Sequence, residues 1–237
     1  MDSRPRPRGS LALPGIGVPF DRGGRARQSG PMLLWLGLLL LAGGAACFAI
    51  DRRAVYVVYE TIDRRTENVV HATTDWAKGA HWLVASAIAY VAARGIAWKF
   101  GPGAVTGLVE TASLAFVVSL AVGSVILHST KILLGRRRPR DELELGLFGW
   151  RPLGFDLQYD SFPSGHALTI FSVAVILSGA LPWLALLWFA LALYLALTRV
   201  MLNSHFLSDV FVGAGIGLLA TREVVLLWYP LLARSWF

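Results

Sequence analysis

The sequence is short of charge and almost without cysteine. Only 16% of its 237 residues are charged, whereas 55% are hydrophobic, and the mean hydropathy is +0.57. Soluble domains carry about a quarter charged residues, so an ordinary soluble domain is excluded, as are disordered and collagen-like chains. The one cysteine, Cys47, cannot form an internal disulfide, which excludes a disulfide scaffold. Long apolar runs instead predict an integral membrane protein.

The net charge of +7 is concentrated at the N-terminus. Six arginines and two aspartates precede Pro31, so residues 1–30 supply +4 and the rest of the chain only +3. A basic segment beside a membrane span binds anionic lipid and stays on the cytoplasmic side, which explains this charge without nucleic acid. Residues 1–30 are therefore predicted to form a disordered cytoplasmic tail, followed by one membrane domain at 31–237.

Apolar runs in the membrane domain predict an all-α bundle of about six transmembrane helices. Residues 167–198 carry no charge. As one helix they would extend about 48 Å, well beyond a hydrocarbon core of roughly 30 Å. The turn residues from Gly179 to Pro182 divide this run into two spans. The other predicted spans are 32–50, 82–98, 104–127 and 209–228. A cleaved signal peptide is the alternative for the first run, but the run is longer than a usual signal core.

Charged residues inside the membrane domain have more than one explanation. Segment 51–80 mixes charges with apolar residues and is predicted to lie on the membrane surface as an amphipathic helix. Arg94 and Glu110 lie inside two predicted spans. Such charges usually face the bundle, where they either form a structural ion pair or contribute to a substrate site.

The alternation of the spans predicts that three polar motifs share one face of the membrane. The loop after the third span, the start of the fourth, the end of the fifth and the start of the sixth all fall on that face. Six spans place both termini on the other side, and the arginine-rich tail assigns that side to the cytoplasm. The motifs are therefore expected at the periplasmic or exterior face.

The first motif is Lys131-Ile-Leu-Leu-Gly-Arg-Arg-Arg138-Pro139. Lys131 and Arg138 are seven residues apart, two helical turns, so both are predicted to project from one face of a helix that continues the third span. Pro139 is predicted to end that helix. The alternative is a basic helix end whose side chains reach the lipid headgroups.

The second motif, Ser161-Phe-Pro-Ser-Gly-His166, directly precedes the fourth span. A Pro-Ser-Gly turn that opens a helix directs backbone N–H groups and the helix dipole outward, which favours an anion. Gly165 permits close approach of a ligand, and His166 can exchange a proton beside it. The alternative is an ordinary N-cap at Ser164 with an interfacial histidine.

The third motif runs from Thr198-Arg199 to His205 and Asp209. At positions i and i+4 of a helix, Asp209 can bind one ring nitrogen of His205 and leave the other as acceptor or nucleophile. Arg199 supplies a permanent cation for a phosphate or carboxylate. Taken alone, the His205–Asp209 spacing also fits a metal half-site or a simple hydrogen-bonded pair.

Together the three motifs resemble the type 2 phosphatidic acid phosphatase superfamily, which includes vanadium haloperoxidases and bacterial membrane lipid phosphatases. The resemblance covers about residues 80–230. Thr198 stands where the family usually has serine, and both residues offer a hydroxyl.

The resemblance implies a metal-independent phosphatase with no cofactor. It implies that His205 is the nucleophile that forms a phosphohistidine, that Asp209 orients it, and that His166 is the general acid. The groups that the resemblance implies for holding the phosphoryl oxygens are Lys131, Arg138, Ser164, Gly165 and Arg199. Three cations and a helix N-terminus can neutralise a phosphoryl group where other enzymes use Mg²⁺.

The expected substrate is a lipid phosphomonoester or diphosphate in the bacterial cytoplasmic membrane. Undecaprenyl diphosphate, phosphatidylglycerol phosphate and phosphatidic acid all fit, and no motif specifies the headgroup, the tail or the oligomeric state. Phe148, Trp150 and Phe155 are expected either to shape a headgroup entrance or to lie at the interface as ordinary aromatics.

Other functions remain open on the sequence. A lipid A 1-phosphatase or a lipid phosphotransferase could use the same scaffold. A transporter or binding protein for anionic lipid would leave the two histidines unexplained. A metallohydrolase would use His166, His205 and Asp209 as metal ligands.

Overall fold

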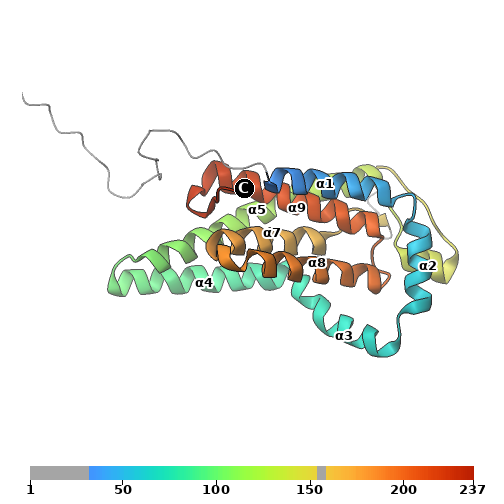
Figure 1. The fold of residues 1–237 in the computed structure, drawn as a ribbon, viewed down its shortest axis with the longest axis horizontal. Coiled ribbons are helices and arrows are strands. Elements are labelled where there is room, and N and C mark those ends of the chain that lie inside the picture. Colours follow the sequence, from blue (N-terminus) through green and yellow to red (C-terminus); the bar gives the residue numbers. More distant parts are fainter. Residues whose placement is uncertain (1–31, 154–158) are drawn as a thin grey trace, which may run out of the picture.

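The long helices of the protein lie side by side with their axes roughly aligned, whereas the short helix Asp51–Thr61 runs across one end of the bundle (Figure 1). The computed structural model describes residues 32–153 and 159–237, and within these ranges there is no β-strand. The predicted tail at 1–30 lies outside the described residues. The helices are α1 (Met32–Cys47), α2 (Asp51–Thr61), α3 (Arg64–Thr74), α4 (Gly79–Phe100), α5 (Ala104–Leu134), α6 (Pro139–Leu145), α7 (Gly165–Ala180), α8 (Ala185–Met201) and α9 (Leu207–Trp228).

The predicted spans correspond to α1, α4, α5, α7, α8 and α9. Of the described helices, α4, α5, α9 and α8 with its preceding turn are long and apolar enough to cross a membrane. The helix α1 passes that test only together with α2, from which it is bent by 85°. The all-α membrane bundle is confirmed, while the number of complete spans is four or five by this measure.

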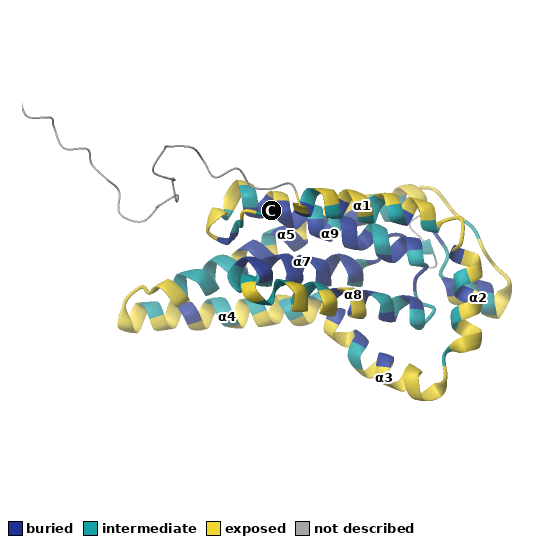
Figure 2. Ribbon diagram, viewed as in Figure 1, coloured by how far each residue is buried: buried dark blue, intermediate teal, exposed yellow. Residues whose placement is uncertain are grey.

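The helix α7 is short and lies at the centre of the bundle. It has 16 residues, about 24 Å of helix, and twelve of them are buried. Figure 2 shows it as the most continuously buried helix, among α5, α8 and α9. Its apolar residues therefore fill a protein core, which does not require the full thickness of a bilayer. The predicted turn after it is confirmed, since α7 ends at Ala180 and a short 3₁₀ turn, Pro182–Leu184, leads into α8.

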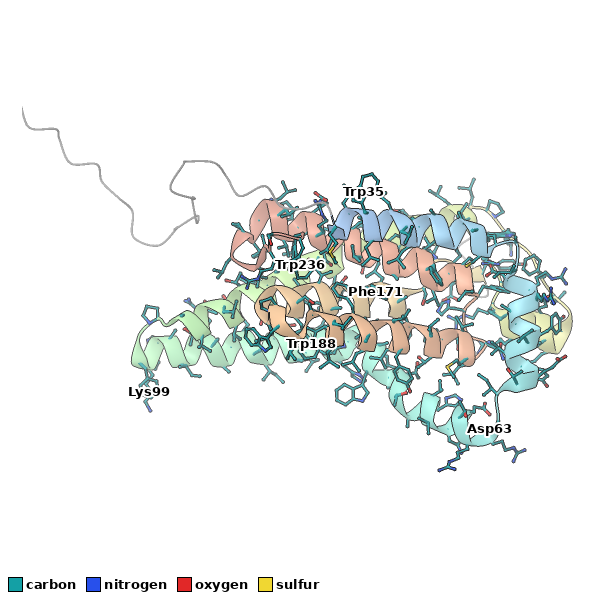
Figure 3. All side chains as sticks on the ribbon, viewed as in Figure 1. Trp35, Asp63, Lys99, Phe171, Trp188 and Trp236 are labelled. Carbon is teal, nitrogen blue, oxygen red and sulfur yellow. The ribbon has the colours of Figure 1, made fainter. Side chains whose placement is uncertain are left out.

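The outer helices expose apolar side chains to their surroundings. Val84, Ile88 and Val91 on α4 are each more than half exposed, and Trp35 points away from the bundle on α1 (Figure 3). Exposed apolar surface of this extent is costly in water. It is the surface expected of helices that face lipid.

Arg94 and Glu110 form an ion pair between α4 and α5, with 3.4 Å between nitrogen and oxygen. Arg94 lies 15 residues beyond the start of α4, about 22 Å along the helix. That position is toward the tip of the α4–α5 hairpin, near Lys99, whereas Asp63 marks the opposite end of the molecule (Figure 3). The structural ion pair is therefore the explanation that the fold favours.

Two glycines on α9 allow α7 to approach it closely. A Cβ added at Gly213 would overlap the carbonyl oxygen of Ser164, and one added at Gly217 would overlap that of Leu168. The contact continues where the backbone N–H of Ser164 donates to the carbonyl of Asp209 at 2.9 Å. This packing fixes the start of α7 against the start of α9.

We expect Gly213→Ala to lower the free energy of unfolding by about 1–3 kcal/mol, because α7 must shift to admit the new methyl group. Thermal unfolding in detergent measures the effect. Gly107→Ala on α5 is the matched control, since no atom lies within 4 Å of its added Cβ. Equal melting temperatures for the two variants would contradict the importance of this contact.

Candidate active site

The three motifs meet at one end of the bundle, beside α2 and α6 (Figure 1). The end of α5, the start of α7, the end of α8 and the start of α9 converge there, as the alternation of spans predicts. Direct contacts join the motifs: the ring of His205 binds the carbonyl of Ser161, and Lys131 lies 3.9 Å from the carboxylate of Asp160.

His205 is buried in the turn between α8 and α9. Its Nδ1 lies 2.8 Å from the carbonyl oxygen of Ser161. A carbonyl can only accept, so Nδ1 carries the proton and the neutral ring keeps Nε2 as a free base. Burial lowers the pKa of His205 below its ordinary value, against the opposing charge of Asp209. The ring is therefore neutral at pH 7.

Asp209 does not make the hydrogen bond to His205 that the i, i+4 spacing predicts. Its Oδ2 lies 3.6 Å from Nδ1 of His205, beyond hydrogen-bond distance. The reason is that α9 begins at Leu207, so His205 lies ahead of the helix. Oδ2 instead accepts hydrogen bonds from Ser161 Oγ at 2.5 Å and from the N–H of Phe206 at 2.9 Å. Asp209 acts on His205 as a nearby buried charge.

The first motif folds differently from its prediction. The helix α5 ends at Leu134, and Pro139 begins α6 rather than ending α5. Gly135 takes a φ of +51°, and an added Cβ there would overlap the carbonyl of Arg151, so the turn requires glycine. Lys131 and Arg138 therefore do not share a helical face.

Asp160 nevertheless brings these two cations together. Arg138 binds its carboxylate through two nitrogens, at 2.8 and 2.9 Å, and Lys131 donates to its backbone carbonyl. Burial alone would raise the pKa of the Asp160 carboxyl, but the hydrogen bonds from Arg138 and the charge of Lys131 lower it below the usual range. The sequence gives no signal for this residue beyond its position directly before the second motif.

Arg199 is held by a residue of the predicted surface segment. Its Nη1 donates to the hydroxyl of Thr74 at 3.0 Å, and Thr198 donates to the same oxygen at 2.9 Å. The Nε atom of Arg199 and Nε2 of His166 are buried without a hydrogen-bond partner among the described residues. Buried polar atoms are normally paired, so both nitrogens have unused hydrogen-bonding capacity at this site.

The second motif begins α7 as predicted. Ser164 is the N-cap, and its hydroxyl lies 3.5 Å from the N–H of Ala167. Gly165 follows, and an added Cβ there would make only an ordinary van der Waals contact with Leu127 at 3.8 Å. Packing within the protein therefore does not require glycine at this position.

Two buried charged residues of this site are missed by the sequence analysis. Arg136 donates to Asp209 at 2.7 Å and to Asp51 at 2.8 Å, and all three side chains are almost completely buried. Asp51 belongs to the segment predicted to lie on the membrane surface, and nothing in the sequence separates it from the other charges there. Phe148 and Trp150 stack on the guanidinium of Arg136, whereas Phe155 lies outside the described residues.

A metal site was one alternative for these side chains. The described residues contain no group of three His, Cys, Asp or Glu side chains placed to hold a metal ion. Both carboxylate oxygens of Asp209 accept hydrogen bonds from nitrogen or oxygen donors of the protein.

Two relatives of known function resemble the chain over part of their length. Lipid A 1-phosphatase of Rhizobium etli is 32% identical over 104 residues, which are 44% of this chain and 45% of that protein. The enzyme of the same name from Rhizobium johnstonii is 29% identical over 99 residues, which are 42% of this chain and 41% of that protein. The chain thus matches less than half of the length of these relatives.

Two crystal structures share the fold. LpxE of Aquifex aeolicus has a TM-score of 0.55 and 19% identity, over 74% of this chain and 94% of that one. The transmembrane PAP2-type phosphatidylglycerolphosphate phosphatase of Bacillus subtilis has a TM-score of 0.58 and 20% identity, over 82% of this chain and 94% of that one. With the apolar helices described above, this likeness identifies an integral membrane protein.

The family model of the PAP2 superfamily matches residues 112–232, about half of the chain, and all three motifs lie inside that range. The chain therefore belongs to the PAP2 superfamily, the family that its motifs resemble.

Proposed function

We propose that this chain is a membrane lipid phosphatase that works through a phosphohistidine at His205. The observation that carries the proposal is the hydrogen bond from Nδ1 of His205 to the carbonyl of Ser161, which leaves Nε2 as a base within a cluster of cations. The curated relatives and the family support the same activity.

In the first step, Nε2 of His205 attacks phosphorus and the bond from phosphorus to the lipid oxygen breaks. His166 gives its proton to the departing oxygen. In the second step water attacks phosphorus, His166 takes a proton from it, and the phosphorus–nitrogen bond breaks to release phosphate and the free imidazole. The charge of Asp209, 3.6 Å away, stabilises the ring while it is positive.

The phosphoryl oxygens would be held by Lys131, Arg138 and Arg199, with the N-terminus of α7. Phosphoryl transfer depends mainly on positioning and on neutralising these oxygens. Asp160 keeps Lys131 and Arg138 together before substrate binds. The unpaired Nε of Arg199 and Nε2 of His166 would gain partners from the substrate.

The substrate is a phosphorylated lipid of the bacterial cytoplasmic membrane, reached from the periplasmic or exterior face. Undecaprenyl diphosphate, phosphatidylglycerol phosphate and phosphatidic acid are candidates. Lipid A 1-phosphate is a second candidate, because the curated relatives at 29–33% identity carry the name lipid A 1-phosphatase.

We expect His205→Ala to abolish phosphate release, because the change removes the proposed nucleophile. The measurement is phosphate release by detergent-purified protein, in EDTA, from a panel of the four lipids. His71→Ala, which alters an exposed histidine on α3, is the control.

The same assay separates the other functions. Folded wild-type protein that releases no phosphate from any lipid would favour a binding protein or a transferase that lacks its acceptor. Activity that EDTA abolishes and a divalent metal restores would favour a metallohydrolase.

We expect a bell-shaped dependence of kcat on pH, since in the substrate complex His205 must be unprotonated and His166 protonated. Burial and the charge of Arg199 lower the pKa of His166 to about 3 in the free site, so the bound phosphate must raise that pKa before His166 can act as an acid. Because its pKa is lowered, His205 stays neutral in more acidic solution. On the acidic side of the profile, the rate should therefore fall to half only at a pH below the ordinary histidine pKa of about 6.5. Steady-state rates from pH 4.5 to 9 measure it. A flat profile between pH 5 and 8 would contradict the assignment of the two histidines.

We expect Asp209→Asn to lower kcat by orders of magnitude, because the amide lacks the charge that stabilises the imidazolium. The kinetics should be compared at matched melting temperature, since the carboxylate also accepts three hydrogen bonds. Near-normal turnover in a folded variant would show that Asp209 does not assist His205.

A further inference from the structure

A chain of three buried charges connects the start of α2 with the catalytic end of α9. Arg136 donates from Nη1 to Oδ1 of Asp209 at 2.7 Å and from Nη2 to Oδ2 of Asp51 at 2.8 Å. Asp51 also accepts the backbone N–H of Ser208 at 3.0 Å, one residue before Asp209. Each of the three charged side chains is at most 1% exposed.

We propose that Asp51 and Arg136 are positioning residues that hold Asp209 in place and preserve its negative charge for His205. The inference rests on the proposed phosphohistidine chemistry. It adds to that chemistry two buried residues: Asp51 is the first residue of α2, and Arg136 follows the end of α5.

The geometry gives Arg136 control over the orientation of Asp209. Arg136 holds one carboxylate oxygen, Oδ1, while Oδ2 is held by Ser161 and by the N–H of Phe206 and lies 3.6 Å from His205. A guanidinium has a rigid, planar fork, so its bonds to two carboxylates define directions as well as distances. A lysine at this position could not bind both carboxylates in the same plane.

The charge balance explains the need for Asp51. With Arg136 alone, Asp209 would belong to a neutral ion pair and would act weakly on His205. A second carboxylate on Arg136 gives the three groups a net charge of −1, so the field of Asp209 at His205 is retained. Buried ion pairs are weak contributors to stability, and their best-supported use is to fix a specific arrangement.

The surroundings of Arg136 favour a fixed cation. Its guanidinium carbon lies 3.8 Å from the ring centre of Phe206 and 4.9 Å from that of Trp150, and Phe48 lies at 5.0 Å. These rings exclude water and add cation–π attraction. Asp51 reaches the guanidinium because the chain bends by 85° between α1 and α2, which turns the first residue of α2 into the bundle.

The test compares charge-changing variants of the full chain in detergent. Asp51→Asn should lower kcat at least tenfold with little change in KM, because phosphate binding depends on other cations. Removing this negative charge should also lower the pKa of His205, whereas Arg136→Gln should raise it. The double variant should return that pKa toward the wild-type value. A purely structural role would not move the pKa in opposite directions.

The measurements are the pH dependence of kcat/KM and a direct NMR titration of His205 with isotope-labelled histidine. The titration works whether or not a substrate is known, so it remains a test if the proposed activity fails. The other charged groups that act on His205 are Lys131, Arg138, Asp160, His166 and Asp209, and all of them keep their residue identity in these variants.

Arg52→Gln is the matched control, since Arg52 is the neighbour of Asp51 and pairs with Glu142 at 2.6 Å outside the chain of three charges. It should leave kcat and the titration of His205 unchanged. If Asp51→Asn does not fold, Arg136→Lys is the second test. Lysine keeps the positive charge but lacks the forked guanidinium, so kcat should fall while the pKa of His205 stays the same. The proposal would be overturned if folded Asp51→Asn kept both the wild-type kcat and the wild-type pKa of His205. It would also be overturned if folded Arg136→Lys kept the wild-type kcat.

Discussion

The carboxylate of Asp209 is the group around which the catalytic end of the bundle is organised. It accepts hydrogen bonds from Arg136 after α5, from Ser161 before α7 and from the N–H of Phe206 at the start of α9. A buried carboxylate is tolerated only when such donors surround it. Three segments that are distant in sequence must therefore fold together, and the same contacts place a negative charge beside His205.

Main-chain contacts set the positions of the catalytic groups. The close packing of α7 on α9 at Gly213 and Gly217 leaves no room for side chains between the two backbones. The Nδ1 atom of His205 is likewise fixed by a backbone carbonyl, that of Ser161. Because backbone atoms cannot change rotamer, the arrangement fixes His205, the proposed nucleophile, in the absence of substrate, which is the condition for electrostatic preorganisation.

Sequence patterns succeeded where a single physical requirement governs a local segment. Bilayer thickness imposes one length on a membrane span, so α4, α5 and α9 could be located from their apolar runs. The prediction failed for the end of α5, where Gly135 turns the chain against the carbonyl of Arg151. The contacting carbonyl belongs to a residue 16 positions later in the chain, so the periodicity of apolar residues along α5 cannot predict it.

Local sequence patterns were enough to predict the all-α membrane bundle, the shared end at which the motifs meet and the residue types proposed for phosphoryl chemistry. Each of these follows from apolar run length, span alternation or short-range spacing. Which groups pair depends on tertiary contacts: the carbonyl of Ser161, rather than Asp209, accepts the hydrogen bond from Nδ1 of His205, and Asp51 is buried with Arg136. These partners lie 44 and 85 residues apart, and their contact depends on how the helices pack.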